Sequence, residues 1–152
     1  MRWIFFILTC AVLFNSCSGR DKQEEAEELL RQANERFEKG DYADALSRID
    51  SLRRIYPNAI DTRKKALKLY QDIELKQAQQ ELAATDSLLQ QVSHNYDYQK
   101  IKVEKDKAEL RATPEELTMF TQTRIKRDSL RTRCEVLGAK IRYIHKKQKE
   151  IK

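Results

Sequence analysis

The sequence predicts an all-α protein, in which a short helical base is followed by a long antiparallel coiled-coil hairpin. Charged residues make up 36% of the chain, and there are only three glycines and two prolines in 152 residues, a balance that favours long helices over sheets with many turns. Apolar residues recur at spacings of three and four, as on one face of a helix. Thr113-Pro114 divides the second half of the chain into two long heptad patterns, which predict an antiparallel helix pair.

The first 16 residues have the pattern of a signal peptide that is removed from the mature chain. Arg2 supplies a positive charge, and an unbroken apolar run from Trp3 to Phe14 follows it. A basic start, a short apolar run and a small residue before the break are typical of export signals. The run is about a dozen residues long, which is short of the roughly 20 that a membrane-spanning helix needs.

The apolar run ends in Leu13-Phe14-Asn15-Ser16-Cys17, which resembles the lipobox of bacterial lipoproteins. In that family the cysteine receives diacylglycerol and becomes the first residue of the mature chain. The resemblance implies that Cys17 is the lipid attachment site and that residues 17–23 form a tether. Acyl chains would then hold the protein on a membrane without a transmembrane helix. An uncleaved signal anchor with an incidental cysteine is the alternative.

The resemblance also implies a location in the cell envelope. Ser18 follows the cysteine, whereas an aspartate there resembles the inner-membrane retention signal of enteric lipoproteins, so we expect the outer membrane rather than the inner. After cleavage only Cys17 and Cys134 remain, and no disulfide framework can form. Stability must therefore come from the packing of helices.

The base, residues 24–74, is predicted to start with a helical pair. One helix is expected from about residue 22 to 39 and a second from 42 to 55, because each carries an apolar stripe with helical spacing. Gly40 suits the end of the first helix, since glycine tolerates a left-handed conformation. Asp41 can cap the second helix, and Pro57 ends it.

This pair resembles a tetratricopeptide repeat, a 34-residue helix–turn–helix unit. Residues 40–46 with Tyr56-Pro57 are also similar to repeats of the BamD family of outer-membrane assembly lipoproteins. The resemblance implies a protein-binding role. Gln32 and Leu52 depart from the family pattern, and only residues 24–57 form a clear repeat, whereas solenoids normally need at least about three. The alternative is a helical hairpin in which these residues serve packing alone. The signature positions are Ala33, Phe37, Gly40, Tyr42, Ala45 and Pro57.

The hairpin, residues 75–152, is predicted from two heptad seams with a turn near 112–113. Thr113, Pro114 and Glu116 form a capping box that starts the second long helix. Pairing outward from the turn places Val103 opposite Arg124 and Leu110 near Leu117. The first seam is Leu75, Ala78, Leu82, Thr85, Leu89, Val92 and Tyr96, continuing through Gln99, Val103, Asp106 and Leu110, and the second is Leu130, Cys134, Leu137, Ile141, Ile144, Gln148 and Ile151.

No set of residues in the sequence indicates catalysis, a cofactor or a metal site. The three glycines are isolated, so no phosphate-binding loop is formed. His94 and His145 have no partner at metal-ligand spacing on the same helix face. Cys134 lies in the second seam, where a thiol acts as a small apolar side chain. We therefore do not expect an enzyme.

The end of the chain is strongly basic. Residues 121–152 contain eleven basic and three acidic residues, a net charge of +8. A candidate patch for an anionic ligand comprises Lys140, Arg142, Lys146, Lys147 and Lys149. For an exported protein, anionic lipid, polysaccharide or an acidic protein surface is a better partner than nucleic acid. The alternative is that these basic residues form a solvated face of the coiled coil and bind no ligand.

Together these features predict a membrane-anchored extracytoplasmic lipoprotein that acts as a non-catalytic protein-interaction or scaffold module. Its expected partners are the membrane, through Cys17, and another envelope protein. Two other functions stay open at this point. One is a coiled-coil spacer or homo-oligomer, and the other is a binder of anionic lipid or polysaccharide through the basic patch.

Overall fold

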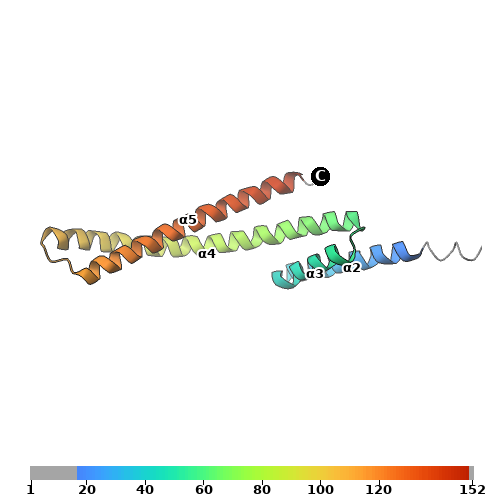
Figure 1. Cartoon of the computed structure of the whole chain (residues 1–152), viewed down its shortest axis with the longest axis horizontal. Helices are drawn as coiled ribbons and strands as arrows, with labels where there is room; N and C mark the ends of the chain where they lie inside the picture. Colours follow the sequence, from blue (N-terminus) through green and yellow to red (C-terminus); the bar gives the residue numbers. More distant parts are fainter. Residues whose placement is uncertain (1–16, 151–152) are drawn as a thin grey trace, which may run out of the picture. The chain divides into compact units, whose positions relative to one another are not determined.

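The computed structural model describes residues 17–150, and these form four helices (Figure 1). The helices are α2 (Cys17–Glu38), α3 (Tyr42–Ile55), α4 (Ile60–Ala108) and α5 (Pro114–Glu150). The all-α class is confirmed, with a helical pair near the N-terminus and a long antiparallel pair after it. The predicted signal peptide, residues 1–16, and the last seam residue, Ile151, lie outside the described residues.

The chain divides into two compact units. We call the described part of the first unit, residues 17–73, the base, and Glu74–Glu150 the hairpin unit. Helix α4 contributes its first residues to the base and the rest to the hairpin unit. The residues expected as a tether, 17–23, lie within α2.

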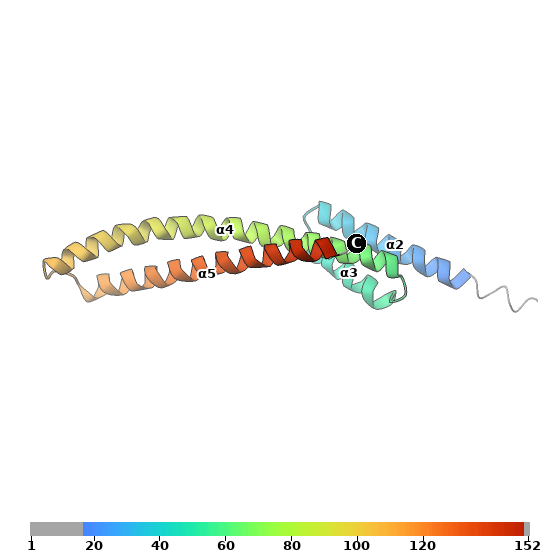
Figure 2. The ribbon, with the colours of Figure 1, turned by 90° about the horizontal axis from the view of Figure 1, so that it is seen from above.

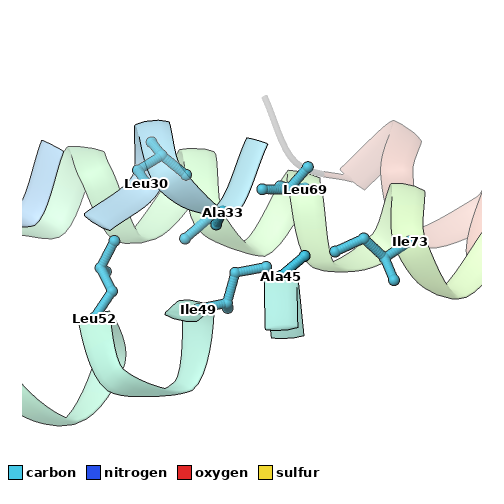
Figure 3. Close-up of a cluster of buried hydrophobic side chains, with 8 residues drawn as sticks. Leu30, Ala33, Ala45, Ile49, Leu52, Leu69 and Ile73 are labelled. Atoms are coloured by element: carbon cyan, nitrogen blue, oxygen red, sulfur yellow. The ribbon is translucent and has the colours of Figure 1, made fainter. Parts of the chain in front are cut away.

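The core of the base is formed by side chains from three helices (Figure 3). Two alanines, Ala33 of α2 and Ala45 of α3, are fully buried, and their small side chains allow a close approach of the helices. Phe37 and Tyr42 pack at the edge of this core with ring centroids 5.9 Å apart. The core residues are Leu30, Ala33, Ala45, Ile49, Leu52, Ala66, Leu69 and Ile73.

The turn between α2 and α3 follows the predicted chemistry. Gly40 has a φ of +77°, a conformation that favours glycine. Its N–H donates to the Phe37 carbonyl (2.9 Å), and the Asp41 N–H donates to the Arg36 carbonyl (2.9 Å), the bond pattern of a Schellman helix end. The Asp41 carboxylate accepts from the Asp44 N–H (3.2 Å) and so caps α3.

Polar contacts also tie the helices of the base together. The Gln23 amide donates to the hydroxyl of Thr62 (2.8 Å), a fully buried residue in the first turn of α4. This bond satisfies a polar group that would otherwise be costly to bury. Asp44 of α3 forms ion pairs with Arg36 of α2 (2.8 Å) and Arg48 of α3 (3.3 Å).

The hairpin unit pairs α4 with α5 along the predicted seams (Figure 2). Every described seam position except Leu110 is buried or half-buried, while most residues between them are exposed. Asn95–Tyr98 is a poor helical sequence, yet it lies inside α4. Tyr96 explains this, because its ring stacks on Phe120 of α5 with centroids 5.1 Å apart. The guanidinium of Arg127 lies 3.8 Å from the centroid of the same Tyr96 ring.

The turn of the hairpin is longer than predicted. The connection covers residues 109–113, which include the expected turn near 112–113 and begin three residues before it. Leu110 is 96% exposed, so its assignment to the seam was wrong. Leu110 instead has a φ of +56° and ends α4 in a second Schellman pattern, since its N–H donates to the Lys107 carbonyl (3.1 Å) and the Arg111 N–H to the Asp106 carbonyl (2.7 Å).

The predicted register between α4 and α5 was also wrong. Lys102 bonds to Glu116, whereas the predicted pairing placed Ile125 opposite Lys102. This contact and those of Tyr96 with Phe120 and of Glu81 with Arg133 show that α5 is displaced by about two and a half to three and a half helical turns. The physical reason is visible in Figures 1 and 2, where the connection runs back beside α4 before α5 begins. The capping box itself is confirmed: Thr113 Oγ1 accepts from the Glu116 N–H (3.3 Å), and Glu116 accepts from the Thr113 N–H (3.2 Å).

Candidate functional site

Cys17, the proposed lipid attachment site, is the first residue of α2. The helix continues from it to Glu38, where the turn of the base begins. None of the helices in the described part of the chain has the length and apolar character that a membrane crossing requires.

The tetratricopeptide-like signature residues gather around one junction in the base. Ala33 and Ala45 lie in the core, and Phe37 and Tyr42 cover its edge. Gly40 makes the turn between them, and Pro57 follows Tyr56, the residue that caps the C-terminus of α3. These positions are therefore used for packing and for turns.

A shallow groove lies between α2 and α4 on the base, and sequence reasoning missed it. We call it the base groove, and its volume is about 300 Å³. Its floor is apolar, because Leu30 and Leu69 are almost completely buried there. Two lysines and the amide of Asn34 give it donor groups, and the Asn34 amide donates to the Leu30 carbonyl (2.9 Å). The lining residues are Leu30, Asn34, Lys65, Lys68, Leu69 and Asp72.

A signal for this groove exists in the sequence. Leu30 and Asn34 are four residues apart, and Lys65, Lys68 and Asp72 are separated by three and four, so each set lies on one face of its helix. Only the packing of α2 against α4 brings the two sets together.

The exposed face of α2 carries a network of charged residues. Arg31 forms ion pairs with Glu28 (2.6 Å) and with Glu35. Hydrogen bonds from Arg31 and Gln32 lower the pKa of Glu28 from 4.5 to about 2. At the end of α3, the hydroxyl of Tyr56 donates to Glu25 (2.7 Å), which raises the pKa of Tyr56. The contact between Tyr56 and Glu25 joins the end of α3 to α2.

The basic patch of α5 is partly neutralised. Lys140 forms an ion pair with Glu74 of α4 (2.6 Å), and Lys147 forms one with Glu150 (2.6 Å), which raises the pKa of Lys147. The Lys147 ammonium also lies 5.8 Å from the centroid of the Tyr143 ring. Residues 140–149 are mostly exposed, so a basic surface is still presented.

No group of three or more His, Cys, Asp or Glu side chains that could hold a metal ion occurs among residues 17–150. Cys134 has a free thiol and is half-buried in the seam of the hairpin unit. The base groove and the basic patch both present charged groups to solvent.

No family model, no curated protein and no solved structure matches this chain.

Proposed function

We propose that this chain is a bacterial envelope lipoprotein, anchored through Cys17, whose base binds an acidic segment of another envelope protein. The anchor is supported by the sequence, in which the apolar run stops at a small residue and a cysteine. The partner surface is supported by the base groove, which combines an apolar floor with two ammonium groups, an amide and the single carboxylate of Asp72. The proposed function involves no catalysis.

The chemistry of the groove defines the partner. Leu30 and Leu69 can contact one apolar side chain, while Lys65 and Lys68 attract carboxylates beside it. Opposite charges steer association and select the partner more than they add affinity. The groove is small, which suits a short peptide segment and a weak, specific complex.

The anchor is tested by the intact mass of the protein extracted from membranes, beside a Cys17→Ala variant. We expect the wild type to begin at Cys17 and to carry added acyl mass. The Cys17→Ala variant should lack both changes. A wild-type chain that retains Met1 would refute the anchor and reopen a cytoplasmic role.

The groove is tested by two matched charge reversals in the full chain. One variant carries Lys65→Glu and Lys68→Glu, and the other carries Lys146→Glu and Lys149→Glu, with the same spacing and the same change in charge. Chemical cross-linking in envelope fractions should give an adduct with the wild type and the second variant, and no adduct with the first. Equal yields from both variants would refute the groove.

The basic patch supports a second candidate function, binding of anionic lipid headgroups. Residues 121–152 carry a net charge of +8, and clusters of basic residues bind anionic surfaces electrostatically. Sedimentation with phosphatidylglycerol vesicles should then fall steeply as salt rises. It should also fall in the Lys146→Glu, Lys149→Glu variant and persist in the groove variant. Salt-insensitive or absent sedimentation would remove this function.

A further inference from the structure

The face of α5 that points away from α4 carries a second heptad pattern. We call it the outer stripe, and its positions alternate in steps of four and three. None of the eight residues is charged, although fifteen of the 37 residues of α5 are. All eight are exposed, and Ile125, Val136 and Tyr143 are 60%, 55% and 61% exposed. The outer stripe is Thr118, Gln122, Ile125, Ser129, Thr132, Val136, Ala139 and Tyr143.

The position of the outer stripe follows from helical geometry. From Thr132 on, each of its members comes two residues after a member of the inner seam, as Val136 follows Cys134 and Ala139 follows Leu137. Two residues turn an α-helix by about 200°, so the two stripes lie on opposite sides of α5. Helix α4 occupies the inner side, and the outer stripe is unpaired in the single chain.

The charges beside the outer stripe are segregated by sign. In its heptad frame, the edge position after three of the four d residues is basic: Lys126, Arg133 and Lys140. The edge position before two of the a residues is acidic: Asp128 and Glu135. Charges at these edges set the orientation and the partner of a coiled coil.

We propose that two copies of this chain associate in parallel through the outer stripe of α5. In a parallel pair, Asp128 faces Arg133 of the second copy and Glu135 faces Lys140 of the second copy, and symmetry repeats both pairs. In an antiparallel pair, the basic edges would face each other and repel. One pair near the end of α5, Arg142 and Lys147, has like charges, so the contact is centred on residues 125–143.

The cations needed for these pairs are already held at the edge of α5. Arg133 is bonded to Glu81, and Lys140 to Glu74. Both side chains are nevertheless about half exposed, at 55% and 45%. Each cation can therefore bind a second carboxylate while it keeps the ion pair with its partner on α4. The conformation of the hairpin unit need not change when the two copies associate.

The outer face of α4 is a poorer candidate for the same contact. Its corresponding positions from residue 77 to 94 are polar or small, and the only large apolar ones are Tyr98 and Ile101, which are 68% and 71% exposed near the hairpin turn. On α5 the apolar members are spread along the stripe, from Ile125 through Val136 and Ala139 to Tyr143. Pairing through α5 on both chains is therefore favoured over pairing through α4.

The pairing should be weak in dilute solution, because half of the outer stripe is polar. Confinement to one membrane surface would raise the effective concentration and would give all copies the same orientation. This last point depends on the proposed anchor, but the contact itself does not.

Disulfide cross-linking of the full chain in detergent tests the contact directly. The background carries Cys10→Ser, Cys17→Ser and Cys134→Ser, so the introduced thiol is unique. Ile125→Cys and Ala139→Cys are tested separately, with Ser87→Cys on the outer face of α4 as the exposed control. We expect both α5 variants to form disulfide-linked dimers at least ten times faster than the control.

Other outcomes of this experiment would overturn the proposal. Rates equal to that of Ser87→Cys would show that the outer stripe makes no contact. Cross-links that form only when the two α5 variants are mixed would show an antiparallel pair.

A charge reversal tests the orientation independently. Glu135→Lys, added to Ala139→Cys, should slow cross-linking several-fold, because it places a lysine opposite Lys140 of the second copy. Asp97→Lys on α4 makes the same change in charge away from the stripe and should leave the rate unchanged. An unchanged rate with Glu135→Lys would refute the parallel pairing. Because every variant lacks Cys17, failure here leaves the anchor and the groove untouched.

Discussion

Replacement of Ile49 by alanine should destabilise the base more than any exposed substitution in α3. Ile49 is fully buried at the centre of the core, between α2 and α4. The change removes three carbon atoms, and each is worth about 0.8 kcal/mol of transfer free energy. The neighbouring helices cannot close the cavity completely, so we expect a loss of about 2–5 kcal/mol.

Ile55 provides a matched control in the same helix. It is 55% exposed at the end of α3, so Ile55→Ala leaves no cavity and should change the free energy of unfolding by about 0.5 kcal/mol or less. Native-state hydrogen exchange of the amides of α2 and α3 measures this free energy for the base separately from the hairpin unit. Similar losses for the two variants would refute the packing argument, since their chemistry is identical and only their burial differs.

Three further predictions concern turns, caps and acid. Gly40→Ala should lower the thermal midpoint, because alanine in the left-handed region costs about 1–2 kcal/mol. Gly138→Ala inside α5 should raise the midpoint, because a glycine within a helix destabilises it by about 0.5–1 kcal/mol relative to alanine. Effects of the same sign in the two variants would contradict this. Thr113→Ala should cost about 1 kcal/mol in urea unfolding, through loss of the α5 cap, and an unchanged midpoint would show that the capping box is dispensable. Because the folded pKa of Glu28 is about 2 instead of 4.5, its stabilising effect is complete above about pH 4.5 and is lost as the pH falls toward 2. Urea midpoints should therefore separate wild type from Glu28→Gln at pH 7 and converge near pH 2, and a gap independent of pH would contradict the pairing with Arg31.

The bounds of α3 could be predicted because local chemistry determines them. Helix α3 begins and ends where expected, at Tyr42 and Ile55, since Asp41 caps its start and Pro57 prevents its continuation. The seams could also be predicted, because heptad spacing alone decides which face of a long helix is apolar. These features depend only on residues that are close in the sequence.

The register of the hairpin could not be predicted in the same way. A heptad seam repeats every seven residues, so several registers bury the same apolar face. The connection decides between them, and its path depends on Leu110, a leucine in a conformation that glycine normally takes. The base groove was missed for a related reason, since its two halves lie on helices that are separated by α3.

The same type of helix end occurs twice in this protein, with different residues at the left-handed position. Glycine occupies it at residue 40, while leucine occupies it at residue 110, where the side chain is also 96% exposed. The leucine therefore incurs a conformational cost of about 1–2 kcal/mol and gains almost no burial in return. Replacement of Leu110 by glycine should therefore stabilise the turn and make the protein more stable. It would also remove the most solvent-exposed apolar side chain of the hairpin tip, which should make the protein less prone to aggregate.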